Sequence, residues 1–110
     1  MKLQNLTTVD LISTDLTFST KDEVIRYLVN QLSEAGKLHS EEDFYQAVIE
    51  RETLSPTGFE GGLAIPHGKS SAVKEASFAV ATLRKPLEDW ESIDEENKVE
   101  LVMLLAIPEN

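Results

Sequence analysis

Two nearly continuous apolar segments constrain the fold of this chain more than any other feature of its sequence. They run from Ser77 to Leu83 and from Val99 to Ile107, and each has the length of one strand. Apolar residues at consecutive positions face both sides of a strand, so these segments are typical of a sheet covered on both faces. Helical patterns precede them, and 110 residues fit one domain with one core. The sequence therefore predicts a single α/β domain, a mixed β-sheet flanked by helices.

Two amphipathic helices are predicted in the first half of the chain. Thr20 and Glu23 form a capping box, after which apolar residues recur at helical spacing until Gly36 ends the pattern. Ser40 caps a second helix whose first turn is acidic, and Arg51 falls in or just past the last turn. Because the link between them is short, the two helices are expected to pack as a pair.

The remaining segments have weaker patterns. Leu16–Phe18 alternates apolar and polar residues and is predicted as a short strand, and Leu63–Ile65 is predicted as a strand that ends at His67. The polar stretch from Pro86 to Lys98 is expected to be a solvated loop or a peripheral hairpin, with Trp90 packed in the core or at its rim. Before the first strand lies an irregular opening with apolar residues that need cover: Leu6, Val9, Leu11 and Ile12.

Composition argues against several classes of protein. Twenty acidic residues against ten basic ones give a formal charge of −10, which repels nucleic acid and anionic lipid. This charge favours a partner with a basic face, or it only keeps the protein soluble. No apolar run approaches the ~18 residues of a membrane span. The chain has no cysteine and its two histidines, His39 and His67, lie far apart, so neither a metal site nor a disulfide is expected, and His39 is interpreted as a surface residue.

The stretch Gly61–Ser70 contains the candidate chemistry. Pro66 restricts the backbone before His67, so the imidazole is held in place, and the glycines allow an anionic group to approach backbone N–H groups. The chain contains neither the Gly-x-Ser-x-Gly elbow of hydrolases nor a glycine-rich nucleotide loop. A neutral imidazole, with a reference pKa of about 6.5, is a competent nucleophile without a triad.

A phosphorus electrophile would suit this imidazole, because phosphoryl transfer depends mostly on positioning and on groups that stabilise negative charge. The Arg51 guanidinium and the backbone at Gly68 are candidates for that stabilisation, and Lys69 and Ser70 add a cation and a hydroxyl. Other interpretations stay open at this point. His67 can cap a turn or lie in the core, Arg51 can serve the helix dipole, and Lys69 and Ser70 can shape the next turn.

The residues Arg51-Glu52, Ser55–Gly58 and Gly62–Ser70 together resemble the active-site region of one protein family. This is the EIIA domain of the fructose/mannitol family of the bacterial phosphoenolpyruvate-dependent sugar phosphotransferase system, and the motif is more similar to its fructose-type subgroup. The resemblance extends over the full length and implies the α/β fold of that family. It implies that His67 accepts a phosphoryl group from the phosphohistidine of HPr and passes it to a cysteine of an EIIB domain, in the cytoplasm. Arg51 is then the residue that contacts the phosphoryl group, and no cofactor is needed.

One departure from the family pattern concerns the end of the chain. The family usually has a second active-site histidine in a C-terminal helical segment, and this sequence ends at Asn110 before that point. Residues 1–110 are therefore expected to be an EIIA domain that lacks this segment. The alternative function is a regulatory EIIA-like module, of the nitrogen-related or transcription-regulator type, in which phosphorylation is a signal. The transported sugar does not follow from the resemblance.

Overall fold

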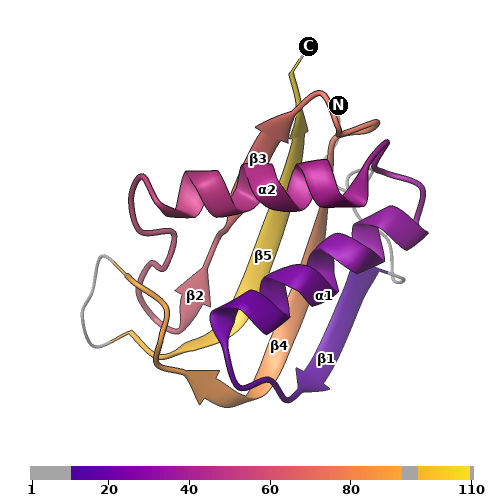
Figure 1. The fold of residues 1–110 in the computed structure, drawn as a ribbon. Helices are drawn as coiled ribbons and strands as arrows, with labels where there is room; N and C mark the ends of the chain where they lie inside the picture. Colours follow the sequence, from indigo (N-terminus) through magenta and orange to yellow (C-terminus); the bar gives the residue numbers. More distant parts are fainter. Residues whose placement is uncertain (1–10, 93–96, 110) are drawn as a thin grey trace.

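The sheet is mixed, and both helices lie together on one of its faces (Figure 1). The structure, a computed structural model, describes residues 11–92 and 97–109. The central pair β4 and β5 is antiparallel, while β1 joins β4 and the short strands β2 and β3 join β5 in parallel. This confirms the predicted fold class. The strands are β1 (Ile12–Leu16), β2 (Leu63–Ala64), β3 (His67–Ser70), β4 (Ser77–Leu87) and β5 (Val99–Pro108).

Both predicted helices form, and their caps are those read from the sequence. Helix α1 (Lys21–Glu34) begins after Thr20, whose hydroxyl accepts from the Glu23 N–H while the Glu23 carboxylate accepts from the Thr20 N–H. Gly36 follows the helix with a φ of 76°, in the left-handed region that favours glycine. Helix α2 (Glu41–Glu52) begins after Ser40, whose hydroxyl accepts from Asp43, and Arg51 lies in its last turn.

The core lies between the helix pair and the sheet. Fully buried aliphatic and aromatic side chains from α1 and α2 face the sheet, α1 mainly over β4 and α2 over β3, and alanines of the two central strands leave room for them. The helix residues are Val24, Ile25, Leu28, Val29, Leu32, Phe44 and Val48, and the sheet residues are Ala79, Ala81, Val102, Leu104 and Ala106.

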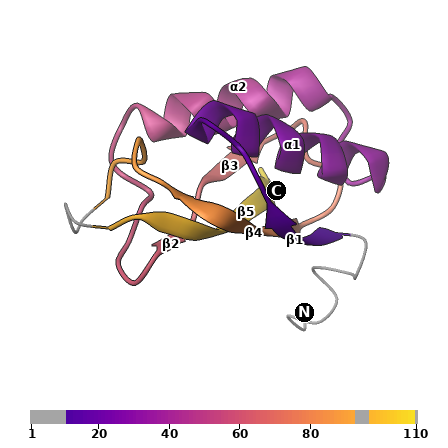
Figure 2. The same ribbon diagram turned by 90° about the horizontal axis from the view of Figure 1, so that it is seen from below.

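The second face of the sheet does not have the cover that the apolar segments predicted. Figure 2 shows both helices on the same side, and no described element lies over the opposite face. Ile12, Leu101 and Ile107 are 45%, 36% and 37% exposed. The prediction of cover on both faces is therefore wrong for residues 11–92 and 97–109. A continuous apolar pattern indicates a strand with two apolar faces, but it does not tell which element, if any, covers each face.

Three boundaries also differ from the predicted ones. Strand β1 begins four residues before the predicted Leu16–Phe18. Its register with β4 is irregular near Asp15, whose φ is 56°, and a bulge of this kind disrupts the alternation of apolar and polar residues along a strand. The strand predicted to end at His67 ends at Ala64 as β2, and a separate strand, β3, begins at His67. Strand β4 continues to Leu87, and the following Trp90 is buried in the core, as expected. The predicted acidic loop residues Asp94–Glu96, like Leu6 and Val9, lie outside the described residues.

Candidate active site

His67 lies at an interruption in the edge of the sheet. Strands β2 and β3 pair with the same strand, β5, with Leu63 and Ala64 beside its first half and His67 opposite Leu105. Between them, Pro66 has no N–H to give to a ladder, although its carbonyl accepts from Leu105 N at 3.0 Å. The proline therefore anchors the backbone directly before the imidazole, as its position in the sequence suggested.

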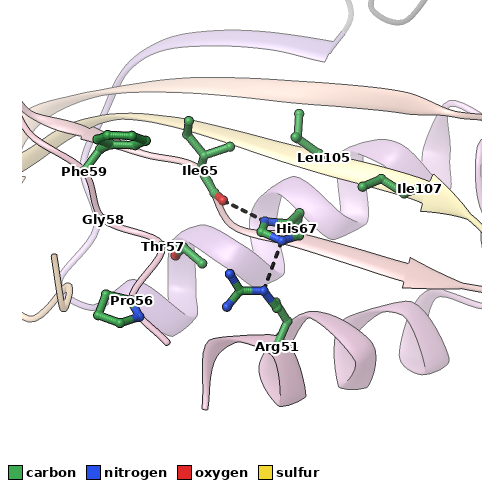
Figure 3. A pocket seen from close by; sticks show the side chains of 9 residues that line it. All are labelled: Arg51, Pro56, Thr57, Gly58, Phe59, Ile65, His67, Leu105 and Ile107. Atoms are coloured by element: carbon green, nitrogen blue, oxygen red, sulfur yellow. Dashed lines mark hydrogen bonds between the residues drawn. The ribbon is translucent and has the colours of Figure 1, made fainter. Parts of the chain in front are cut away.

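The two nitrogens of the His67 ring have different partners. Nδ1 lies 3.1 Å from the Ile65 carbonyl oxygen, and Nε2 lies 3.1 Å from Nε of Arg51 (Figure 3). A carbonyl only accepts and a guanidinium only donates, so Nδ1 carries the proton and the lone pair of Nε2 faces Arg51. The ring is thus in the tautomer with the proton on Nδ1 and a free lone pair on Nε2.

Arg51 reaches His67 from the last turn of α2. Its Nη1 donates to the carbonyl oxygen of Ser55 at 3.1 Å, while Nε donates to the imidazole. The part of the chain that the structure describes contains no ion pair of Arg51, so its positive charge is not matched by a neighbouring carboxylate. The guanidinium is therefore held beside Nε2 with its charge available to an anion.

A hollow on each side of the Arg51–His67 pair opens to the surface. One, of about 320 Å³, is lined by the loop before β2 and by β5 (Figure 3). The other, of about 440 Å³, lies between the last turn of α2 and the end of β5. Three large apolar side chains stay exposed around these hollows: Leu54 (79%), Phe59 (45%) and Ile107 (37%). The site is a shallow, largely apolar surface with one imidazole and one guanidinium at its centre.

The other predicted site residues lie close by in sequence but have different surroundings. Gly68 is buried against α2, where an added Cβ would lie 3.0 Å from side chains of Phe44 and Val48, so its lack of a side chain serves packing. Lys69 is exposed and lines the second hollow. The Ser70 hydroxyl accepts from Ala72 N at 3.0 Å, so it shapes the next turn. The phosphoryl contacts predicted for Gly68, Lys69 and Ser70 stay predictions.

Sequence reasoning gave no individual role to several residues of the site. Pro56, Thr57 and Phe59 line the first hollow, and the turn pattern of this segment was the signal that pointed to them. His39 is exposed, as expected. Within residues 11–92 and 97–109, no three His, Asp or Glu side chains are grouped so that they could hold a metal ion, and no helix is long and apolar enough to cross a membrane.

Comparison with known proteins places this geometry in a family. The family described as phosphoenolpyruvate-dependent sugar phosphotransferase system, EIIA 2, matches residues 5–110. The chain is 48% identical over 110 residues to the PTS system 2-O-alpha-mannosyl-D-glycerate-specific EIIABC component of Escherichia coli (strain K12), a match that covers 100% of this chain and 17% of that protein. The chain thus spans less than a fifth of the length of this relative.

Solved structures agree with this match. The nitrogen regulatory protein IIA-Ntr of Neisseria meningitidis has a TM-score of 0.86 and 29% identity, over 96% of this chain and 70% of that one. Enzyme IIAMTL of Escherichia coli, solved in complex with phosphorylated enzyme IIBMTL, has a TM-score of 0.79 and 25% identity, over 94% of this chain and 72% of the matched chain. The chain therefore belongs to the EIIA 2 family of the phosphoenolpyruvate-dependent sugar phosphotransferase system.

Proposed function

We propose that this domain is a cytoplasmic phosphoryl relay. In this proposal, His67 accepts a phosphoryl group from the phosphohistidine of HPr and passes it to a cysteine of the EIIB domain of a sugar permease of the fructose type. The observation that carries the proposal is the protonation pattern of the ring. The Ile65 carbonyl holds the proton on Nδ1, and this leaves the Nε2 lone pair at the surface beside the Arg51 guanidinium.

Each transfer exchanges one bond to phosphorus for another. In the first, the Nε2 lone pair forms a bond to phosphorus while the bond from phosphorus to the donor histidine nitrogen breaks, and its electron pair stays on the donor ring. In the second, the thiolate of the acceptor cysteine attacks phosphorus, and the bond to Nε2 breaks with its electron pair returning to His67. The proton on Nδ1 takes part in neither step, so the Ile65 contact persists throughout the cycle.

Arg51 is proposed to stabilise the phosphoryl group in both transfers. Its Nε–H points at the lone pair of Nε2 in the unphosphorylated protein, at the place where phosphorus must arrive. An incoming phosphoryl group therefore displaces this hydrogen bond, and the same N–H then donates to an equatorial oxygen. Such a donor, fixed before the reaction, offsets the negative charge of the transferred group without reorganisation.

The surface around the ring is proposed to dock both partners in turn. Leu54, Phe59 and Ile107 provide exposed apolar area, and Glu50 adds an acidic group at the edge of the second hollow. With a formal charge of −10, the protein attracts a donor whose docking face is basic. Since donor and acceptor must both reach Nε2, they compete for the same surface. The sugar never reaches this surface, so the permease determines which sugar is transported.

The second candidate is a regulatory module, in which phosphorylation of His67 is a signal and nothing is passed on. The similarity to a nitrogen regulatory protein favours it, whereas the higher identity to the EIIABC component of a sugar system favours the relay. Transfer from phosphorylated His67 to the purified EIIB domain separates the two functions. A domain that is phosphorylated by HPr but transfers to no EIIB is a regulatory module.

The test uses the two histidines of the chain as a matched pair. Incubated with phosphorylated HPr, the wild-type protein and His39→Gln should each gain one acid-labile phosphate, and His67→Gln should gain none, because His39 lies outside the site. Circular dichroism verifies that both variants fold. Labelling of the folded His67→Gln protein, or no labelling of the wild type, refutes the proposal.

A further inference from the structure

A buried carboxylate next to the site has no role in the relay as described so far. Glu52, the last residue of α2, follows Arg51 directly, and its side chain is only 5% exposed. Its Oε2 lies 2.7 Å from Nζ of Lys21, the first residue of α1, a distance typical of a close ion pair. Burying a carboxylate this deeply has a considerable desolvation cost, so the groups that bind Glu52 indicate its role.

The other oxygen of Glu52 binds the loop of the active site. Oε1 accepts a hydrogen bond from the Thr57 hydroxyl, and the same hydroxyl oxygen accepts from Nε1 of Trp90 at 3.0 Å. An indole only donates and a carboxylate only accepts, so the direction of both bonds is fixed. The hydroxyl of Thr57 therefore joins Glu52 to the core at Trp90.

Two hydrogen bonds connect Thr57 to the imidazole, one between backbone groups and one between the ring and a backbone carbonyl. The Thr57 carbonyl accepts from Ile65 N at 2.9 Å, and the Ile65 carbonyl is the group that faces Nδ1 of His67. Thr57 and Ile65 also line the hollow in front of the ring (Figure 3). A shift of Thr57 therefore moves the backbone of Ile65, whose carbonyl oxygen favours the tautomer with the proton on Nδ1.

We propose that Glu52 and Thr57 are positioning residues of the phosphoryl transfer. They hold the Ile65 carbonyl at Nδ1, so that His67 stays in the tautomer with a free lone pair on Nε2. Lys21 neutralises the buried carboxylate, and the Trp90 indole donates a hydrogen bond to the Thr57 hydroxyl oxygen. This inference rests on the proposed function of His67 and adds the residues that prepare the ring before the phosphoryl group arrives.

The test replaces Thr57 by valine, which keeps the shape of the side chain and removes both hydrogen bonds. Proton–nitrogen correlation NMR of the unphosphorylated protein should then show that His67 loses its pure Nδ1–H form and populates the Nε2–H tautomer. The initial rate of phosphorylation by HPr should fall by about tenfold or more, because the nucleophile is misplaced. Thr57→Ser keeps the hydroxyl and should retain both the tautomer and the rate of the wild type.

Two further variants make the outcome specific. Thr53→Val is the matched control, since it removes a hydroxyl that donates only to the Glu50 carbonyl, and it should change neither readout. Glu52→Leu removes the acceptor of the Thr57 hydroxyl together with the charge that pairs with Lys21. It carries the test if Thr57→Val does not fold, and it too should shift the tautomer. If the folded variants keep the wild-type tautomer and rate, and lose only stability, the inference is wrong. The tautomer is read without any phosphoryl donor, so failure of the relay itself remains a separate result.

Discussion

Gly68→Ala provides a sharp test of how helix α2 is seated under the active site. A Cβ at this position would lie 3.0 Å from Cε1 of Phe44, 3.0 Å from Cγ2 of Val48 and 3.3 Å from the backbone nitrogen of Val48. Ordinary contacts of this kind measure about 3.5–4.0 Å. The two side-chain atoms can move apart by rotation, but the backbone nitrogen moves only if the whole helix does.

The expected cost follows from this geometry. Overpacking by one methyl group in a closely packed core costs typically about 1–3 kcal/mol of unfolding free energy, and we expect a value near the middle of that range. The unfolding free energy of a natural domain is only about 5–15 kcal/mol, so this loss should be plain in urea unfolding. A displaced α2 would also carry Arg51 away from His67 and lengthen their 3.1 Å contact, and this should slow phosphorylation.

A double-mutant cycle shows whether the steric reasoning is correct. Val48→Ala removes one of the two crowded side chains, so it should cost less in the Gly68→Ala background than in the wild type, with a coupling of about 0.5–3 kcal/mol. Gly61→Ala is the control, because that glycine has a φ of 67° and no atom within 4 Å of an added Cβ. Its cost comes from the backbone alone and should not couple to Val48. Additive behaviour of Gly68→Ala with Val48→Ala would refute the account of this contact.

Three further predictions concern charge, docking and pH. Arg51→Lys keeps the positive charge but not the Nε donor at Nε2 of His67, so the rate of phosphorylation by HPr should fall by about a hundredfold; a wild-type rate would contradict the role of Arg51. Leu54→Ser should change the unfolding free energy by no more than about 0.5 kcal/mol, because Leu54 is 79% exposed, yet it should raise the Kd for EIIB in a calorimetric titration; an unchanged Kd counts against the docking surface. Burial and the hydrogen bond from its hydroxyl to Asp22 raise the pKa of Tyr45 above its ordinary value of 10.0. The folded state therefore favours the neutral phenol of Tyr45. Its contribution to the unfolding free energy is complete below pH 10.0 and is lost as the pH rises through the folded pKa. In urea unfolding above pH 10.0, Tyr45→Phe should therefore lose less unfolding free energy than the wild type.

The helices were predictable because their signals are local. The capping pair Thr20 and Glu23, the cap Ser40 and the stop at Gly36 each act within one turn, and each appears in the structure as read. The cover of the sheet and the place of β1 depend on partners far away in sequence. Parallel pairing of β1 with β4, and a bulge near Asp15, leave little trace in the alternation of five residues.

The central pair of the site was also predictable, but its support was not. The motif around His67 and the resemblance of Arg51 to a family residue indicated two groups that the last turn of α2 does bring together. The role of Glu52 and Thr57 depends on Trp90, more than thirty positions later in the chain, whose indole reaches Thr57 only in the folded protein. No spacing in the sequence carries that information.

The measurement that tests the central claim most directly is the position of the phosphoryl group on the ring of His67. Phosphorus NMR and proton–nitrogen correlation spectra, recorded on the protein after reaction with phosphorylated HPr, identify the ring nitrogen bonded to phosphorus. The account predicts a bond to Nε2, with the proton still on Nδ1 and in contact with the Ile65 carbonyl. A phosphoryl group on Nδ1, or on a residue other than His67, would contradict it.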